Sequence, residues 1–188
     1  MGSHKERMLR GEPYLPHDPE LAADRRRCRL LVERLNATSA TDEQAIARIL
    51  GELLGSIGDA ACVTPPLWCD YGFSISIGAR SFLNFGTVIL DGAAVSIGAD
   101  VQIGPSVQLL TASHPLAAGV RREFWESAQP ISIGDGAWLG GGVIVCPGVN
   151  IGADAVVGAG SVVTRDVPAE HLAVGNPCRV VRDLSSRG

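Results

Sequence analysis

From Ile77 onward the sequence repeats with a period of six residues, and this period constrains the fold more than any other feature. The first position of every repeat is Ile, Leu or Val, the second is often Gly, and the fifth is usually small or branched. Ile97 and Ile133 lie 36 residues apart, so the period survives an interruption at Pro115. The repeats read IGARSF, LNFGTV, ILDGAA, then after a two-residue slip IGADVQ, IGPSVQ, LLTASH, and after the break IGDGAW, LGGGVI, VCPGVN, IGADAV, VGAGSV, VTRDVP.

A period of six matches neither one face of an α-helix nor the alternation of a half-buried strand. It indicates a parallel β-helix, in which each repeat supplies one short flat side and one turn. We expect the aliphatic first position to point inward and to stack on its counterpart in the next coil. We expect Gly where a corner needs a positive φ or a close approach of two backbones. Such a solenoid is stabilised by contacts between neighbouring coils and needs a cap at each end.

The segment before the repeats is helical in character, from residue 8 to about residue 58. DPELAADRRRCRLLVERLN predicts a helix with Asp18 as N-cap and Pro19 at the first helical position. The run of three arginines that begins at Arg25 is expected on its solvated face. TDEQAIARILGELLGSIG predicts a second helix, capped by Thr41 or Asp42.

We therefore divide the chain into a helical cap segment, residues 1–58, and a repeat domain, residues 59–188. The repeat domain carries a loop at residues 115–130 and ends in the tail RVVRDL, which is expected to cap the far end. The fold class is mainly β.

The amino-acid composition indicates which binding partners and which cellular compartment to expect. Aromatic residues make up 5% of the 188 residues, so the core must be built from aliphatic side chains. A net charge of −4 gives no reason to expect nucleic acid or an anionic membrane as a partner. Five cysteines without a C-x-x-C pair, and no secretory signal, favour reduced thiols in the cytoplasm. No stretch reaches 18 apolar residues, so we expect a soluble protein.

The break in the repeat predicts the position of the functional site. The interior of a β-helix is filled by stacked aliphatic side chains, so a small-molecule site must be built outside it, from loops and from a neighbouring subunit. Residues 115–130, PLAAGVRREFWESAQP, form the one long departure from the repeat. Long loops are where function concentrates. His114 stands at the root of this loop.

Several motifs resemble, in the same order, those of the maltose/galactoside branch of the hexapeptide-repeat O-acetyltransferases. The resemblance covers nearly the whole chain. It implies a left-handed parallel β-helix, a handedness opposite to that of ordinary crossover connections. It also implies a homotrimer with sites between subunits, and transfer of acetyl from acetyl-CoA to a sugar hydroxyl, commonly the 6-position. The motifs are MLRGEPY, CDYG, NFGTVILD, LTASHPL, PISIGDGAWLGGGVIVCPGVNIG, GAGSVVTRDVP and VGNPCRVVR.

Acetyl transfer to an alcohol needs a base that works near neutral pH, and an ordinary histidine, with a pKa of about 6.5, suits that task. The resemblance makes His114 the general base; the alternative is that it only hydrogen-bonds a turn. Asn84 replaces the usual Gly at the second position of its repeat, where an outward amide is hard to explain by packing. The family places an Asn there as the oxyanion stabiliser.

The resemblance also implies the residues that bind the acceptor and the donor. Asp18, Asp70 and Asp91 fall at or near sugar-contacting positions, with a helix cap and a turn residue as the alternatives for Asp18 and Asp91. Glu126 lies in the loop where a further contact is expected. Gly92 stands where some galactoside enzymes carry a second Asp, which points to the maltose or glucose side.

Coenzyme A has a long pantetheine arm and anionic phosphates, so it needs a smooth groove and cations. The chain has no phosphate-binding G-x-x-x-x-G-K-[ST] loop. The residues assigned to coenzyme A are Trp138, Gly141, Ala159, Thr164, Arg165, Arg179 and Arg182.

The same repeat also occurs with other functions, and each of these would need different residues. A metal enzyme on this fold needs three converging histidines, and the repeats contain only His114, so no metal is expected. A non-catalytic trimer of hexapeptide repeats would leave Asn84, His114 and the basic C-terminal residues unexplained. The same chemistry on an antibiotic hydroxyl, an amino alcohol or a lipo-oligosaccharide stays open.

Overall fold

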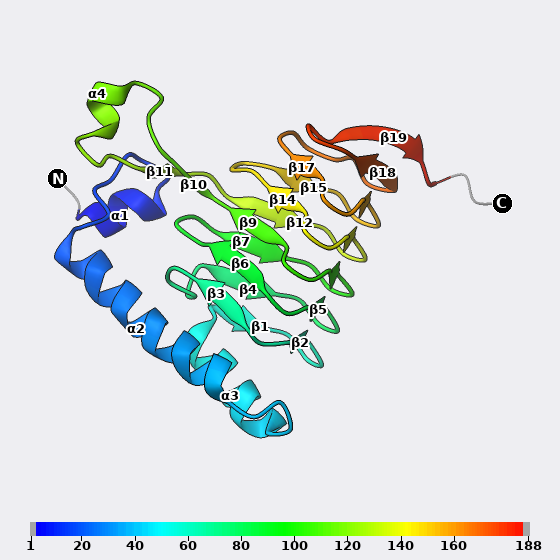
Figure 1. The fold of residues 1–188 in the computed structure, drawn as a ribbon, viewed down its shortest axis with the longest axis horizontal. Coiled ribbons are helices and arrows are strands. Elements are labelled where there is room, and N and C mark those ends of the chain that lie inside the picture. The colour runs from blue at the N-terminus through cyan, green and yellow to red at the C-terminus, as the bar shows by residue number, and fades with distance from the viewer. Residues whose placement is uncertain (1–2, 186–188) are drawn as a thin grey trace.

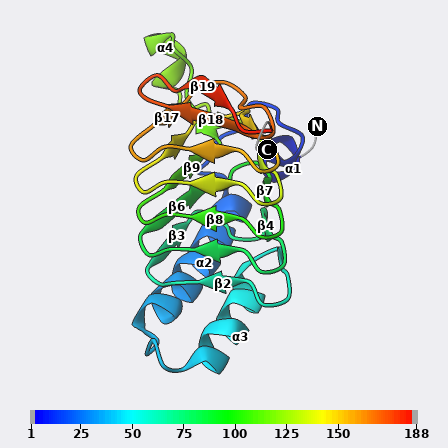
Figure 2. The ribbon, with the colours of Figure 1, turned by 90° about the vertical axis from the view of Figure 1, so that its right-hand side faces the viewer.

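A computed structural model, which describes residues 3–185, shows a parallel β-helix whose coils have three flat sides each. The sides stack into three sheets, called here sheets I, II and III (Figures 1 and 2). All pairings between coils are parallel, as the repeat predicts, and the last strand of sheet II returns antiparallel.

Sheet I contains β1 (Ser56–Ile57), β4 (Ile75–Ile77), β7 (Val95–Ile97), β12 (Ile131–Ile133) and β15 (Asn150–Ile151). Sheet II contains β2 (Cys62–Val63), β5 (Phe82–Leu83), β8 (Gln102–Ile103), β13 (Trp138–Leu139), β16 (Val156–Val157), β18 (His171–Val174) and β19 (Arg179–Asp183). Sheet III contains β3 (Leu67–Cys69), β6 (Thr87–Leu90), β9 (Gln108–Leu110), β14 (Ile144–Val145) and β17 (Val162–Val163).

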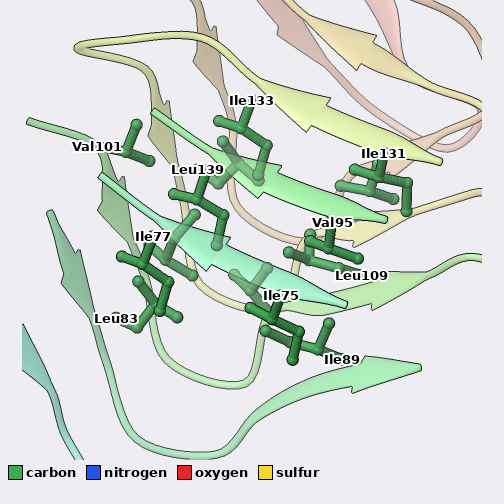
Figure 3. Packing of buried hydrophobic residues seen from close by; sticks show 14 of the residues in the cluster. Ile75, Ile77, Leu83, Ile89, Val95, Val101, Leu109, Ile131, Ile133 and Leu139 are labelled. Carbon is green, nitrogen blue, oxygen red and sulfur yellow. The ribbon is translucent and has the colours of Figure 1, made fainter. Parts of the chain in front are cut away.

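The aliphatic first position of each repeat fills the interior, as predicted. Ile77 pairs with Ile97, and Ile97 with Ile133, in one column. All three are at most 4% exposed. Figure 3 labels Ile77 and Ile133 within this core. Burying each such side chain contributes about 1.5–3 kcal/mol. The filled interior leaves no room for a ligand.

Glycine at the second position is explained by close approach. A Cβ at Gly134 would lie 2.5 Å from the backbone nitrogen of Ala153 in the next coil, and Gly134 does not have a positive φ. The left-handed residues stand at the fourth position instead, as at Arg80 (φ 59°) and Asp100 (φ 57°). Of the two expected reasons for glycine, close approach to the next coil therefore applies at the second position, and positive φ applies at the fourth.

The irregularities of the repeat fall on one edge of the prism, where sheet III passes to sheet I. We call this edge the III–I corner. Ile133 pairs with a residue 18 positions further on, whereas Ile77 pairs with one 20 positions on, and the two extra residues lie at this corner. The 36-residue step from Ile97 to Ile133 joins adjacent coils, so the excursion at residues 111–130 adds the length of one coil at the same corner.

The excursion leaves the stack as a pair of antiparallel strands and carries a short helix at its tip (Figure 1). Its elements are β10 (Ala112–Ser113), α4 (Ala118–Arg121) and β11 (Ser127–Ala128). The returning strand packs against the N-terminal segment. Tyr14 and Glu126 exchange two backbone hydrogen bonds, and the ring centroids of His17 and Phe124 lie 6.2 Å apart.

The helical cap has three helices, α1 (His4–Leu9), α2 (Pro19–Ala37) and α3 (Glu43–Leu53). Asp18 caps α2 and Asp42 caps α3, as predicted. Helix α1 was not predicted, although Ser3 and Glu6 form a capping box whose S-x-x-E pattern is visible in the sequence. At the opposite end of the stack, β19 closes sheet II, which confirms the tail RVVRDL as a cap (Figure 2).

The boundary between cap and repeats lies slightly earlier than residue 58, because β1 already pairs with β4 in the first coil. Ile57, Val63 and Cys69 continue the six-residue spacing backward, and this spacing was the available signal. Within residues 3–185 no helix combines the length and hydrophobicity needed to cross a bilayer.

The close approach of coils makes a prediction about stability. Gly134→Ala should lower the free energy of unfolding by about 1–3 kcal/mol, since the atoms it meets are backbone atoms of the next coil. Gly51→Ala is the matched control: it lies in α3 with open space around its Cβ and should stabilise by up to about 1 kcal/mol. Denaturant unfolding of both variants measures this, and equal effects would contradict the packing explanation.

Candidate active site

His114 lies at the III–I corner, directly after β10, where the chain leaves the stack for the excursion. Its side chain is 56% exposed. Its Nε2 atom lies 3.9 Å from the Oε1 atom of Glu126, on the returning arm of the excursion. The imidazole is therefore open to a ligand on one side and faces a carboxylate on another.

The carboxylate of Glu126 is fixed from the N-terminal segment. The hydroxyl of Tyr14 donates a hydrogen bond to Glu126 Oε2 at 3.1 Å. Tyr14 is 1% exposed, and burial together with the negative charge of Glu126 raises the pKa of its hydroxyl, which keeps the proton on the tyrosine. Sequence analysis did not single out Tyr14, because nothing in a linear pattern pairs residues 112 positions apart.

Asp91 lies beneath this corner and is fully buried. Its Oδ1 accepts hydrogen bonds from the backbone nitrogens of Asp70 at 3.0 Å and Tyr71 at 2.9 Å. Burial raises the pKa of Asp91 to about 6, against the opposing effect of the bond from Tyr71. Its Oδ2 is buried and has no hydrogen-bond partner among the described residues. The sequence predicts that Asp91 contacts the sugar directly, but its side chain has no exposed atom. The geometry fits the alternative, in which Asp91 holds a turn.

Asp70 is half-buried at the same corner, above the carboxylate of Asp91. Burial raises the pKa of Asp70, Arg25 opposes that change, and Glu126 adds to it. Arg25 donates a 2.8 Å hydrogen bond to the hydroxyl of Tyr71 and another to the carbonyl of Pro16. The expectation that Arg25 belongs to a solvated face is therefore wrong: it joins α2 to this corner.

Asp18 is placed as the cap of α2, where its Oδ1 accepts from the backbone nitrogen of Glu20 at 3.0 Å. It remains partly exposed and follows His17, which contacts the excursion. Gly92 lies in the corner itself, and a Cβ there would come within 3.0 Å of the Tyr14 hydroxyl oxygen.

A second group of predicted residues meets at the edge between sheets II and III, the II–III corner. Asn84, Trp138, Gly141 and Ala159 line one groove of about 500 Å³ that runs across neighbouring coils. Trp138 is 55% exposed on its floor. Asn84 Oδ1 accepts a 2.8 Å hydrogen bond from the backbone nitrogen of Phe85, which orients the amide.

Arginines stand at the end of the same sheet. Leu172 lines the groove and is the register partner of Arg182, while Val174 is the partner of Arg179 on β19. Both arginines are exposed. The groove is thus apolar and smooth along its length and is followed by positive charge.

The remaining predicted residues lie across sheet III from this groove. Thr164 and Arg165 follow β17 and are exposed at the III–I corner. Asn84 precedes β6 and His114 follows β9, so the width of sheet III separates them within one chain. The four residues of β6 alone span about 13 Å. Reacting groups must approach to about 3 Å, so one chain cannot place Asn84 and His114 on the same acetyl group.

Two family models match the chain. The maltose acetyltransferase hexapeptide capping motif matches residues 7–58, and the bacterial transferase hexapeptide (six repeats) matches residues 130–165.

Individual relatives match nearly the full length. Nodulation protein L of Rhizobium meliloti (strain 1021) is 47% identical, over 95% of this chain and 97% of that protein. The galactoside O-acetyltransferase of Escherichia coli (strain K12) is 35% identical, over 97% of this chain and 90% of that protein.

Two solved structures agree with the fold in detail. A maltose O-acetyltransferase from Clostridium difficile 630 has a TM-score of 0.97 at 40% identity and covers 98% of this chain and 99% of its own. A hexapeptide-repeat acetyltransferase from Vibrio cholerae O1 biovar eltor, solved in complex with acetyl coenzyme A, has a TM-score of 0.92 at 40% identity. It covers 98% of this chain and all of its own.

The six-residue repeat fold, taken with these matches, defines a protein of the acyltransferase class. The chain belongs to the hexapeptide-repeat O-acetyltransferases, in the maltose/galactoside branch, and is an acetyltransferase that uses acetyl-CoA as donor. No group of three or more His, Cys, Asp or Glu side chains in residues 3–185 is placed to hold a metal ion.

The buried carboxylate predicts a pH dependence of stability. Because the pKa of Asp91 is raised from 3.8 to about 6 in the fold, the native state binds its proton more tightly, and stability from this group falls as pH rises from about 4 to 6. Asp91→Asn removes that loss while keeping an oxygen acceptor for the backbone. The free energy of unfolding of Asp91→Asn, measured relative to that of the original protein, should therefore rise by about 3 kcal/mol between pH 4 and pH 7. Melting curves across this range test it, and a constant difference would show that Asp91 does not titrate there.

Proposed function

We propose that this acetyltransferase moves acetyl from acetyl-CoA to a hydroxyl of a sugar such as maltose, glucose or a galactoside, with the 6-hydroxyl as acceptor. The observation that carries the proposal is the placement of His114 at a corner rich in carboxylates, opposite a smooth groove that ends in arginines. We place the enzyme in the cytoplasm, where its five free cysteines stay reduced.

His114 acts as the general base. As the acceptor oxygen attacks the thioester carbonyl, its proton moves to the imidazole and a carbon–oxygen bond forms. The negative charge on the former carbonyl oxygen is stabilised by the amide N–H of Asn84. Collapse of this intermediate breaks the carbon–sulfur bond, and the leaving coenzyme A thiolate takes the proton from the imidazolium. The products are the acetyl ester and the free thiol.

Carboxylates suit an acceptor with several hydroxyls because each oxygen accepts hydrogen bonds. Asp70 and Glu126 face the space beside His114, and Asp18 lies at its N-terminal edge. Asp91 supports the site from below by holding the backbone of Asp70.

Coenzyme A fits the groove at the II–III corner. Gly141 and Ala159 leave room for the pantetheine arm beside Trp138, and the guanidinium groups of Arg179 and Arg182 suit its phosphates. Thr164 and Arg165 complete the donor site from the neighbouring subunit.

The contrast in polarity between sheet I and sheet III supports assembly into a homotrimer. The outward positions of sheet I are polar, whereas those of sheet III are mostly apolar and include Trp68, 51% exposed. The outward column of sheet I is Ser56, Ser76, Ser96, Ser132 and Asn150, and that of sheet III is Trp68, Val88, Gln108, Ile144 and Val162.

Three copies closed with sheet III facing a common axis would cover this apolar column. The closure also brings the II–III corner of one copy to the III–I corner of the next. Asn84 and the groove of one copy then meet His114, Thr164 and Arg165 of its neighbour. The assembly thus accounts for the separation of the two groups of residues within one chain.

A lipo-oligosaccharide acceptor is the second candidate. The tip of the excursion exposes apolar side chains, with Leu116 at 96% and Phe124 at 66% exposed. An acceptor with an acyl tail would cover them while presenting the same sugar hydroxyl to His114.

The assay is release of free thiol from acetyl-CoA with a panel of hexoses, disaccharides, acylated oligosaccharides and hydroxylated antibiotics. His114→Ala should lower kcat by about 10²–10⁴ with little change in KM for acetyl-CoA. Asn84→Ala should behave in the same way. Arg179→Ala and Arg182→Ala should raise KM for acetyl-CoA with little change in kcat, because phosphate contacts bind ground and transition states alike.

Each variant is first shown by light scattering to keep the assembly state of the original protein. If no sugar raises thiol release above background, the sugar assignment is wrong. If His114→Ala keeps the original kcat, the histidine is a turn residue and the base lies elsewhere.

A further inference from the structure

A partly buried hydrogen bond at the III–I corner has no part in the chemistry described above. Tyr14 donates to one oxygen of Glu126 at 3.1 Å, and the other oxygen of that carboxylate lies 3.9 Å from His114 Nε2. The three side chains form a line from the N-terminal segment, across the excursion, to the base.

We propose that Tyr14 is a positioning residue for the acetyl transfer: it holds the carboxylate of Glu126 facing His114, and Gly92 leaves the room that its hydroxyl occupies. This inference rests on His114 being the base of the proposed function.

The position of the tyrosine hydroxyl is determined on every side. The backbone of Tyr14 exchanges two hydrogen bonds with that of Glu126, of 2.9 and 3.0 Å, so the tyrosine side chain starts from a fixed point. Its ring packs in a small apolar cluster with Met8, Leu21 and Tyr71. The hydroxyl then reaches the space above Gly92, and even a methyl group there would lie 3.0 Å from its oxygen and 3.3 Å from Cβ of Ala128. Both contacts are tighter than ordinary packing.

The carboxylate matters most when the imidazole becomes charged. Before the reaction His114 is a neutral base; once it takes the acceptor proton it is an imidazolium, and a negative charge 3.9 Å away stabilises it. The stabilisation ends when the proton passes to the coenzyme A thiolate. An interaction that is strong only while charge is present lowers the barrier without tightening substrate binding.

Glu126 is also the group at this corner that must be kept in place. The titratable and charged groups around it are Tyr14 and His114, then Asp70 and Tyr71 on the turn after β3, with Arg25 of α2 behind them. The negative charge of Asp70 repels the carboxylate of Glu126. The hydroxyl of Tyr14 is the hydrogen-bond donor that opposes this repulsion.

The test is a double-mutant cycle in the full-length assembled enzyme, with thiol release as the assay. Tyr14→Phe should lower kcat by about tenfold, as for loss of a hydrogen bond to a charged group, while KM for acetyl-CoA and for the acceptor stays unchanged. Gly92→Ala, which displaces the hydroxyl, should have a similar effect. In the double variant the oxygen that the added methyl group would meet is gone, so the second substitution should add little to the first.

Tyr71→Phe is the matched control. It also removes a hydroxyl from the same apolar cluster, but that hydroxyl bonds Arg25 and does not touch Glu126. It should change kcat little. Melting temperatures of all four variants establish that they are folded.

The outcomes separate this inference from the proposed function. An active original enzyme whose Tyr14→Phe variant keeps its kcat, or changes only KM, overturns the positioning role and leaves the acetyl transfer intact. Additive effects of Tyr14→Phe and Gly92→Ala, or an equal loss in Tyr71→Phe, also overturn it. An original enzyme that acetylates no acceptor overturns both.

Discussion

The close stacking of one coil on the next is the constraint on which the rest of the structure depends. The interior is filled by aliphatic columns such as that of Ile77 and Ile97, and second-position glycines such as Gly134 allow no side chain between coils. The filled core cannot hold a ligand. The protein must therefore build its site on the outside of the prism, and we propose that the acceptor side of the site lies where the repeat is interrupted.

The interruptions collect at the III–I corner because a corner can lengthen without disturbing the columns on either side. Two extra residues in each of the first two coils create the turns that carry Asp70 and Asp91, and one extra coil length creates the excursion that carries His114. The N-terminal segment then packs on this corner through Tyr14. The groove proposed for the donor lies at the II–III corner, on the other side of sheet III. Under the proposed function, this division makes the site depend on a second copy of the chain.

The sequence predicts the repetitive part of this structure well, because the aliphatic columns are a one-dimensional pattern. The left-handedness of the β-helix is implied only by the family resemblance, because a period of six residues is compatible with either hand. The repeat domain is predicted from residue 59, but the repeats are traced only from Ile77: Ile57 and Val63 keep the spacing, and Pro65 and Pro66 interrupt the pattern that follows.

The site was predictable only in part. The break in the repeat marks His114, and the amide at a glycine position marks Asn84. No pattern could show that Asp91 would be buried, because its burial depends on the turn that folds over it. The pairing of Tyr14 with Glu126 joins segments far apart in the sequence, and local residue types carry no trace of it.

In the proposed assembly, each site takes its base from one copy and its oxyanion donor from the next. The most direct measurement mixes two variants that are each inactive, His114→Ala and Asn84→Ala, by joint refolding or coexpression with different tags, and assays the purified mixed assemblies. If the site is shared, one of the three interfaces in every mixed trimer combines an intact His114 with an intact Asn84, and about a third of the original kcat per site should return. Mixed assemblies that contain both variants and remain as inactive as either alone would contradict the shared site.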